Sequence, residues 1–340
     1  MKELEKEGEG KMVYLRVSGR AIVNVHTANA EGAVGNYMAL SKMFVVRRGE
    51  DGNLDVSEEP VISGNMIKHW HAVATTEILK SWGYKAICSN CERHIMFRSV
   101  LGKTENLSDE IDFIRKCAIE DLHGFLDVEK QIRRESLVKF SFMIPVEERR
   151  AEYSSITHNR VVTTPRGNVP DREEARKLYG VEEAMGVMKR EHASGLYGFL
   201  CSMDLAYVAT SLSDPSKKLS RDNYKVRVKA AILGLTELLS GHFGAAQARA
   251  LPIVKVTELI CLASKTPIPN LAHGFYKDYA EESAGIVKTA VEKGLVKENQ
   301  IKVLVVGEKP ASAFKAKDVS FKEVKTFSEA IGEVLGMIEE

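Results

Sequence analysis

The chain has 340 residues, of which 44% are hydrophobic and 28% charged, and its 48 basic side chains balance 47 acidic ones. This size suits one large domain with insertions, or two domains, and the apolar content supports a sizeable core. The charge balance excludes a polybasic protein, so any nucleic acid has to be held by a local patch of cations.

The sequence shows no pattern of a signal peptide or a membrane span. Its first ten residues, MKELEKEGEG, are charged, and we expect residues 1–11 to form a flexible leader. Asp204 interrupts the best apolar candidate, residues 196–209, so no stretch is long enough to cross a bilayer. Five sparse cysteines favour a reducing compartment over a disulfide scaffold. We therefore expect a soluble, cytoplasmic protein.

Residues 12–26 are predicted to form a long strand with one buried face. Its odd positions are apolar or small, whereas its even positions include Arg16, Ser18, Arg20, Asn24 and His26. This period of two predicts that one face packs on a core and the other presents cations and hydrogen-bonding groups in a row. Because alternation alone implies no ligand, an ordinary solvated face stays an alternative.

A loop over residues 27–42 follows, and its glycines let the backbone approach a partner closely. A short strand is predicted over residues 44–48. Ser63-Gly64-Asn65 then precedes a predicted helix over residues 66–82. Free N–H groups at the start of this helix, beside Lys68 and His69, suit a phosphate group, although plain capping is the commoner role.

The middle of the chain is predicted to contain an insertion and a projecting loop. Residues 84–136 have a mostly helical pattern, and residues 137–144 have that of a strand. Residues 151–172 hold two prolines, many polar residues and several cations, which indicates a long projecting loop. Such loops in compact domains are usually functional or disordered.

The C-terminal half alternates strands and helices. Strands are predicted over residues 195–212, 253–263 and 301–306, and helices over a region ending at 239 and over 276–295 and 324–338. A glycine-bounded break, Gly241–Gly244, follows the first of these helices. This order is compatible with a ferredoxin-like βαββαβ core that carries large insertions, although periodicity alone leaves other α/β arrangements open.

Three basic segments would form a groove for a phosphate backbone if they converge. They are the first strand, the loop with His158, Asn159, Arg160 and Arg166, and the run 217–229, which includes Lys225 and Arg227. Binding of single-stranded RNA often adds aromatic stacking. The candidate aromatic residues beside these segments are Tyr37, Tyr153 and Tyr224.

The spacing Cys88-Ser-Asn-Cys91 is that of a zinc-binding pair. Cys117 and His123 would complete a tetrahedral site, in which zinc would have a structural role within the insertion. The alternative is a pair of reduced cysteines near a turn.

The sequence contains no Walker A loop, no G-x-S-x-G elbow and no H-E-x-x-H motif. His158 could act as a general base for RNA cleavage, but the sequence sets no second acid or base beside it. We therefore expect a binding protein that is not an enzyme and requires no cofactor.

Six segments in order resemble the DevR-like RAMP family, the "Cas seven" backbone subunits of type I CRISPR Cascade, with the archaeal I-A branch as the closest fit. They are SGRAIVNVHTANAEGAVGNY (18–37), PVISGNMIKHWHA (60–72), CAIEDLHGFL (117–126), ESLVKFSFMIPVEE (135–148), ITHNRV (156–161) and LSGHFGAAQARALP (239–252). The resemblance spans roughly residues 13–265.

This resemblance implies an α+β, hand-shaped single domain over residues 12–340. It would consist of a ferredoxin-like (RRM-like) palm, a finger-type helical insertion at about 66–136 and a protruding thumb loop at about 151–172. Copies would stack helically along a guide RNA (crRNA), together with other Cascade subunits, and leave its bases free to pair with target DNA.

The residues expected to contact RNA combine the resemblance with the basic segments. They are Arg20, Asn24, His26, Asn29, Gly35, Asn36, Arg47, Arg48, Ser63, Asn65, Lys68, His69, His158, Asn159, Arg160, Arg166, Lys225, Arg227 and Arg249.

Two other hypotheses stay open. A RAMP endoribonuclease that cuts crRNA or target RNA would use His158 or Glu31, the only acid in the loop after the first strand. Related type III proteins use an aspartate in that loop, in a different setting, and we therefore do not expect cleavage here. A zinc-stabilised α/β protein of unrelated function would rest on Cys88 and Cys91.

Overall fold

The computed structural model describes residues 13–27, 29–49, 51–96, 105, 107–181, 185–245 and 247–339, so the predicted leader lies outside the described residues. The largest sheet has the order β14-β13-β12-β1-β11-β3-β2, and β8, β9 and β10 also pair with β11. Its strands are β1 (Tyr14–His26), β2 (Ala30–Val34), β3 (Tyr37–Leu40), β8 (Val138–Phe140), β9 (Ile144–Pro145), β10 (Glu152–Val161), β11 (Met185–Asp204), β12 (Ile253–Ser264), β13 (Ile301–Val306) and β14 (Lys322–Glu323).

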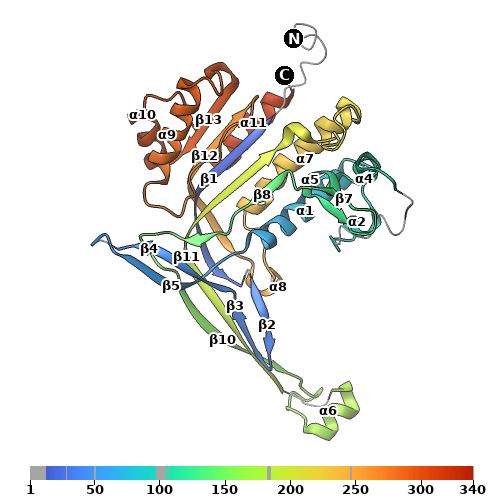
Figure 1. Cartoon of the computed structure of the whole chain (residues 1–340). Coiled ribbons are helices and arrows are strands. Elements are labelled where there is room, and N and C mark those ends of the chain that lie inside the picture. The colour runs from blue at the N-terminus through green and yellow to red at the C-terminus, as the bar shows by residue number, and fades with distance from the viewer. Residues whose placement is uncertain are drawn as a thin grey trace.

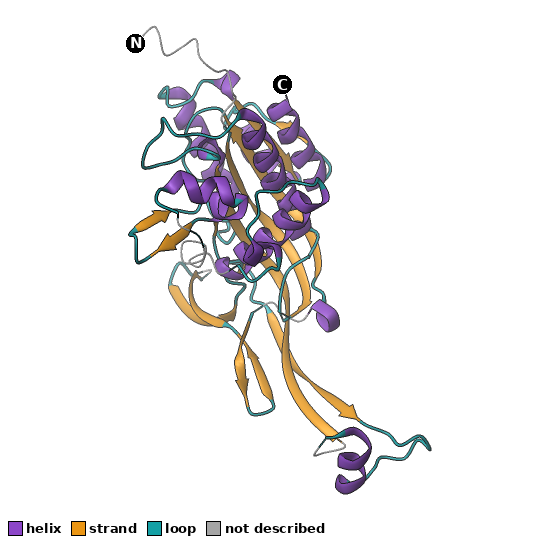
Figure 2. Ribbon diagram, turned by 90° about the vertical axis from the view of Figure 1, so that its right-hand side faces the viewer, coloured by secondary structure: helices purple, strands orange, loops and turns teal. Residues whose placement is uncertain are grey.

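Helices cover both faces of this sheet, as Figures 1 and 2 show. One core joins the sheet to α1, α7 and α11, and a second joins its other face to α9 and α10. The helices are α1 (Gly64–Ser81), α2 (Ser89–Glu92), α4 (Glu110–Lys116), α5 (Ala118–His123), α6 (Arg172–Tyr179), α7 (Arg221–Leu239), α8 (Gln247–Ala250), α9 (Tyr279–Glu292), α10 (Glu308–Ala316) and α11 (Phe327–Glu339). The fold is therefore a mixed α and β arrangement.

The prediction that β1 exposes its polar face is wrong, because the segment 268–276 covers that face. Arg16, Ser18 and Arg20 donate hydrogen bonds of 3.1, 2.6 and 2.8 Å to backbone carbonyl oxygens of this segment. Gly274 approaches so closely that an added Cβ would lie 2.0 Å from a backbone oxygen of β1. The polar row of β1 thus binds the chain's own backbone, about 250 residues further on.

A long arm projects from the sheet in Figures 1 and 2. It consists of β10, the first half of β11, the β2–β3 hairpin and α6 at the tip. The prediction of a loop over residues 151–172 is wrong for residues 152–161, which pair with β11 from Glu152–Ser194 to Val161–Met185. This strand was missed because its sequence, EYSSITHNRV, has no apolar face, and most of its side chains are exposed.

The segment after α1 lies where the sequence predicts an insertion. It contains α2, α4, α5 and the hairpin of β6 (Phe125–Asp127) and β7 (Ile132–Arg134). A third core cluster, which includes Leu79, Phe113 and Ile119, packs these elements against α1. Because α1 itself contacts α7 and the sheet core, it belongs to the helical layer of the sheet and not to the insertion, so the boundary predicted at residue 66 is too early.

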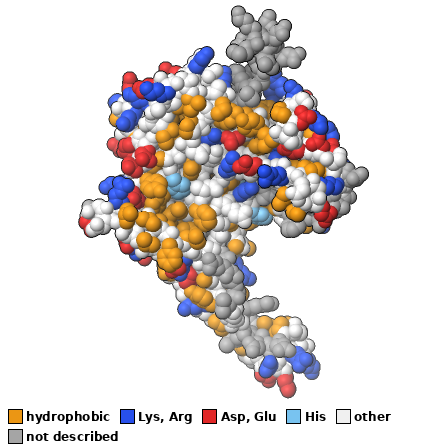
Figure 3. Space-filling view, in the orientation of Figure 1, with side chains coloured by type: hydrophobic (Ala, Val, Ile, Leu, Met, Phe, Trp, Pro, Cys, Tyr) orange, Lys and Arg blue, Asp and Glu red, His pale blue; other side chains and the backbone are white. Residues whose placement is uncertain are grey.

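A separate hairpin of β4 (Lys42–Arg48) and β5 (Leu54–Pro60) extends from the root of the arm. Its outer face is apolar and exposed, with Phe44 and Leu54 exposed by 76% and 71%. Figure 3 shows hydrophobic side chains gathered over this part of the surface. No helix among the described residues has the length and apolar character of a membrane span.

Four buried charges connect the insertion to the sheet layer. Arg134 on β7 forms ion pairs of 2.6 Å with Glu110 on α4 and 2.7 Å with Asp121 on α5. Arg227 on α7 binds the other oxygen of Asp121 at 2.7 Å. All four side chains are at most 3% exposed, so removal of one partner leaves an uncompensated charge in the interior.

Replacement Arg134→Met should lower the free energy of unfolding by about 3–5 kcal/mol, because Glu110 loses its ion-pair partner and Asp121 loses one of its two while both stay buried. Urea denaturation measures this loss. The neighbouring Arg133 is exposed, and Arg133→Met should change stability by less than about 0.5 kcal/mol. Equal stability of the two variants would contradict the role given to the buried cluster.

Candidate nucleic-acid interface

Asn29 and Ser63, which lie far apart in sequence, form a reciprocal pair at the root of the arm. The Asn29 side-chain amide donates to Ser63 Oγ at 3.0 Å, and the Ser63 backbone N–H donates to Asn29 Oδ1 at 2.9 Å. Ser63 Oγ also accepts the N–H of Met66 at 3.2 Å and so caps α1. The loop after β1 is thereby fixed beside the start of α1.

The N-terminal end of α1 has no acidic side chain in its first turn. Asn65 is exposed there, and Lys68 and His69 are half-buried on the same helix. The positive end of the helix dipole is therefore not neutralised by an acidic side chain of the first turn. This arrangement suits an anion.

The glycine-bounded break after α7 lies against the same helix. Trp70 on α1 stacks on His242, with ring centroids 6.4 Å apart and planes 18° apart. Gly241 has a φ of 94°, and a Cβ there would meet a backbone oxygen at 2.7 Å, so this turn requires glycine. Arg249 follows on α8 and is exposed. Segments near residues 29, 63–69 and 241–250 thus meet at the root of the arm.

The arm carries the candidates from the expected thumb. His158 is half-buried, and its ring centroid lies 6.0 Å from that of His192 on β11. Burial, together with the nearby charge of His158, lowers the pKa of His192. Asn159 and Arg166 are exposed, whereas the side chain of Arg160 lies outside the described residues.

Two of the predicted aromatic residues lie beside one acid of the arm. Tyr37 donates a hydrogen bond to Glu191, which also accepts the backbone N–H of Leu40 at 2.9 Å. Lys42 lies 3.5 Å from Glu191 and 4.0 Å from the ring centroid of Tyr153. Both tyrosines are exposed and available for stacking, by 37% and 46%. The third, Tyr224, lies half-buried on α7, where burial raises its pKa to about 12.

Four predicted contact residues are internal, so their assignment to the RNA surface is wrong. Arg20 binds Glu148 with two bonds of 3.0 and 3.1 Å, and it is 4% exposed. His26 is fully buried against the Tyr197 hydroxyl at 2.8 Å. Burial lowers the pKa of His26 to about 3, so the ring is neutral.

Arg47 and Arg227 are the other two. Arg47 forms an ion pair of 3.3 Å with Glu59 and donates to backbone carbonyls of residues 145–147. Arg227 binds Asp121 within the buried cluster. A guanidinium buried with its own carboxylate is not available to a phosphate, and the sequence of either segment gives no sign of that burial.

The remaining candidates lie in several places. Gly35 and Asn36 are exposed in the turn between β2 and β3 on the arm, and Arg48 is exposed at the end of β4. Asn24 is half-buried at the end of β1. Lys225 lines a different groove between α7 and α11 and does not join the arm-root group.

Sequence reasoning missed Arg149 and Arg150, which directly precede β10. They line a cavity of about 580 Å³ together with Asn24, and a neighbouring cavity of about 780 Å³ beneath the β4–β5 hairpin. Arg150 forms an ion pair of 2.7 Å with Asp55. The run VEERR contained the signal, but its two glutamates cancel the two arginines in a count of charge.

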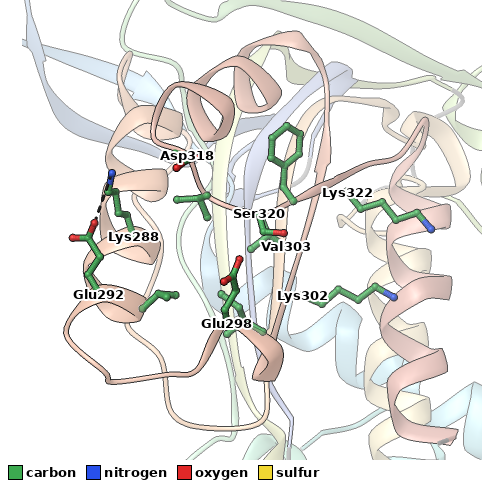
Figure 4. Close-up of a pocket in the computed structure, with 12 residues that line it drawn as sticks. Lys288, Glu292, Glu298, Lys302, Val303, Asp318, Ser320 and Lys322 are labelled. Carbon is green, nitrogen blue, oxygen red and sulfur yellow. Dashed lines mark ion pairs between the residues drawn. The ribbon is translucent and has the colours of Figure 1, made fainter.

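A third cavity, of about 320 Å³, lies between α9 and β13 (Figure 4). Its cations already have partners: Lys288 pairs with Glu292 at 3.7 Å, and Lys302 and Lys322 both pair with Glu333, at 2.7 and 3.0 Å. It is therefore a poor phosphate site.

Three of the four predicted metal ligands converge in the insertion. The sulfur atoms of Cys88, Cys91 and Cys117 all lie within 4.8 Å of one another, so this group could hold a metal ion. Hydrogen bonds from the Cys117 and Cys91 thiols lower the pKa of Cys88. The prediction of His123 as fourth ligand is wrong, because its Nε2 lies 2.8 Å from His71 Nδ1.

Comparison with known proteins gives a consistent family. Residues 17–284 match the family described as "CRISPR-associated negative auto-regulator DevR/Csa2". A "CRISPR-associated protein Cas7/Cst2/DevR" from Methanocaldococcus jannaschii is 37% identical over 83% of this chain and 91% of its own. The "CRISPR-associated aCascade subunit Cas7/Csa2 2" from Saccharolobus solfataricus is 27% identical over 85% of this chain and 90% of its own.

A solved structure shares the fold. A chain of a "CRISPR RNA-guided surveillance complex, pre-nicking" superposes with a TM-score of 0.50 and 11% sequence identity, over 96% of this chain and 100% of the other.

His26 should make the protein sensitive to acid. Its pKa is about 3 in the native state against 6.5 when solvated, so the native state binds fewer protons, and stability is lost as the pH falls below 6.5. Replacement His26→Gln should remove up to about 1.4 kcal/mol per pH unit of that loss. Urea unfolding measured from pH 7 to pH 4 checks this. The prediction is contradicted if the free energy of unfolding falls with pH equally in the wild type and in His26→Gln.

Proposed function

Because the chain belongs to the CRISPR-associated DevR/Csa2 family, we propose that it binds a guide RNA along the RNA backbone and forms the repeating backbone of a Cascade surveillance complex. The observation that carries this proposal is the convergence, at the root of the arm, of the Asn29–Ser63 pair, the N-terminal end of α1 and the glycine-bounded break. A helix N-terminus with the exposed Asn65, together with the exposed Arg249 on α8, suits phosphate groups.

We propose that the strand order β12-β1-β11-β8, with α1 and α7 as the connecting helices, is a ferredoxin-like palm. The insertion after α1 would then be the finger region, and the arm with α6 would be the thumb. Both belong to a single hand-shaped domain in this proposal, since the insertion shares its core cluster with α1 and the arm continues the strand β11.

The partners in this proposal are a guide RNA, target DNA paired to its bases, further copies of the chain and other Cascade subunits. A protein that contacts phosphate and sugar leaves the base edges free, so base pairing selects the target. A head-to-tail assembly needs two different surfaces on each copy. The arm and the exposed apolar face of the β4–β5 hairpin are suited to that purpose.

We also propose that the chain holds RNA without cutting it. His158 is the candidate base, and the buried ring beside it is His192, whose lowered pKa leaves it without the extra proton that a general acid would donate near neutral pH. The side chain of Glu31 lies outside the described residues. A labelled repeat or target RNA should stay intact with and without divalent metal, and specific cleavage would replace this proposal with the endoribonuclease alternative.

RNA binding requires no cofactor in this proposal. For the three-cysteine group we propose zinc in a structural role, because sulfur ligands that include a Cys-x-x-Cys pair are typical of structural zinc.

The proposed function is tested by measuring the mass and the RNA content of the purified protein. Size-exclusion chromatography with light scattering should show growth to an assembly of several copies when a guide-length single-stranded RNA is added. A monomer indifferent to RNA would contradict the proposal.

Replacement Asn65→Asp should weaken RNA binding by about tenfold at low salt, because it puts a negative charge at the proposed phosphate site. The same change should leave thermal stability equal or higher, since an acid in the first turn favours the helix. Asn299→Asp, exposed in the short turn Glu298–Gln300 before β13, is the matched control and should bind as the wild type does.

Fluorescence anisotropy across salt concentrations measures both variants. Equal affinities of Asn65→Asp and the wild type for RNA would show that the phosphates do not pass the start of α1.

Lys68→Ala should make the affinity for RNA less dependent on salt. The slope of log K against log salt concentration should fall by about 0.7 if the Lys68 ammonium contacts one phosphate.

A further inference from the structure

Three cysteines from two separate segments of the insertion meet at one point. Cys88 is the N-cap of α2 and Cys91 lies within its single turn, whereas Cys117 connects α4 to α5. Cys91 and Cys117 are 1% and 0% exposed, and Cys88 is half-buried. Their sulfur atoms lie within 4.8 Å of one another, a spacing compatible with ligands around one ion.

The backbone around Cys88 forms a closed turn. The N–H of Glu92 donates to the Cys88 carbonyl at 2.9 Å, and that of Ile95 donates to the Asn90 carbonyl at 2.9 Å. These bonds hold Cys88 and Cys91 in one turn, with the spacing of a zinc-binding pair. The thiolate is the form in which cysteine binds metal.

We infer that Cys88, Cys91 and Cys117 bind one zinc ion that fastens α2 to the α4–α5 junction, so that the fold of the insertion depends on metal. A soft, all-sulfur set favours zinc over magnesium or calcium. These three thiols are the ligands that the described residues bring together. Each thiol releases its proton on binding, so binding weakens as the pH falls.

The short elements of the insertion explain why an ion is needed. α2, α4 and α5 have only 4, 7 and 6 residues, and helices of that length are marginal in water. Figure 1 shows them on the opposite side of the molecule from the β4–β5 hairpin. Loss of the ion should therefore loosen residues 86–123 and leave β1 and β12 protected. The inference rests on the proposed structural zinc and does not depend on RNA binding.

Metal content of the full chain is the direct test. The reduced protein is loaded with zinc, freed of excess by gel filtration and analysed by elemental analysis and native mass spectrometry. The wild type should carry one zinc per chain, and Cys88→Ser less than a tenth of that. Cys201→Ala removes a buried thiol of β11 and should keep one zinc per chain.

Two readouts on the wild type keep the test independent of how well a variant folds. Cobalt in place of zinc should give the intense sulfur-to-metal absorption of a multi-thiolate site. Chelation should speed amide exchange in residues 86–123 by at least tenfold and leave β1 and β12 unchanged.

A folded, reduced wild type that binds no zinc would overturn the inference, and so would full zinc retention by Cys88→Ser or a Cys88–Cys91 disulfide in the protein as purified. RNA binding is measured on the same samples. A protein that binds no zinc but assembles normally on RNA would contradict the metal site alone. A protein that binds zinc but no RNA would contradict only the proposed function.

Discussion

The covering of β1 on both faces is the constraint on which the rest of the structure depends. Its polar side chains hydrogen bond to the backbone of residues 268–276, which fixes the α9–α10 layer on the sheet. With α1 and α7 on the other face, the residues of β1 from Tyr14 to Ala21 are all buried and offer no open sheet surface to a ligand. The contacts that we propose for RNA therefore lie beyond this part of the strand, where the arm, α1 and the glycine-bounded break meet.

The arginines show how one residue type serves two purposes. Arg20, Arg47 and Arg227 are buried with carboxylates and hold layers together, and the desolvation of each is offset by fixed partners. Arg48, Arg149 and Arg249 are exposed around the arm root and hairpin. Only these exposed guanidinium groups can bind a phosphate in place of water at little cost in free energy. Buried arginines thus stabilise the fold, and exposed ones are available for a ligand.

Local signals in the sequence predicted local structure well. The cap at Ser63, the helix after it and the Cys88–Cys91 turn follow from short-range chemistry, and the structure confirms them. The strand β10 and the burial of Arg20 could not be predicted, because an arm with solvent on both sides has no apolar period and a covering segment 250 residues away leaves no local trace. His123 failed as a ligand for a similar reason, since His71 became its neighbour only through the packing of α1.

We propose that RNA follows the root of the arm and not the basic stretch 217–229. Ultraviolet cross-linking of the RNA-bound assembly, followed by mass spectrometry of the attached peptides, tests this most directly. We expect cross-links in residues 29–37, 63–70, 153–166 and 241–250. Cross-links confined to residues 217–229, or to the α9–α10 layer, would contradict it.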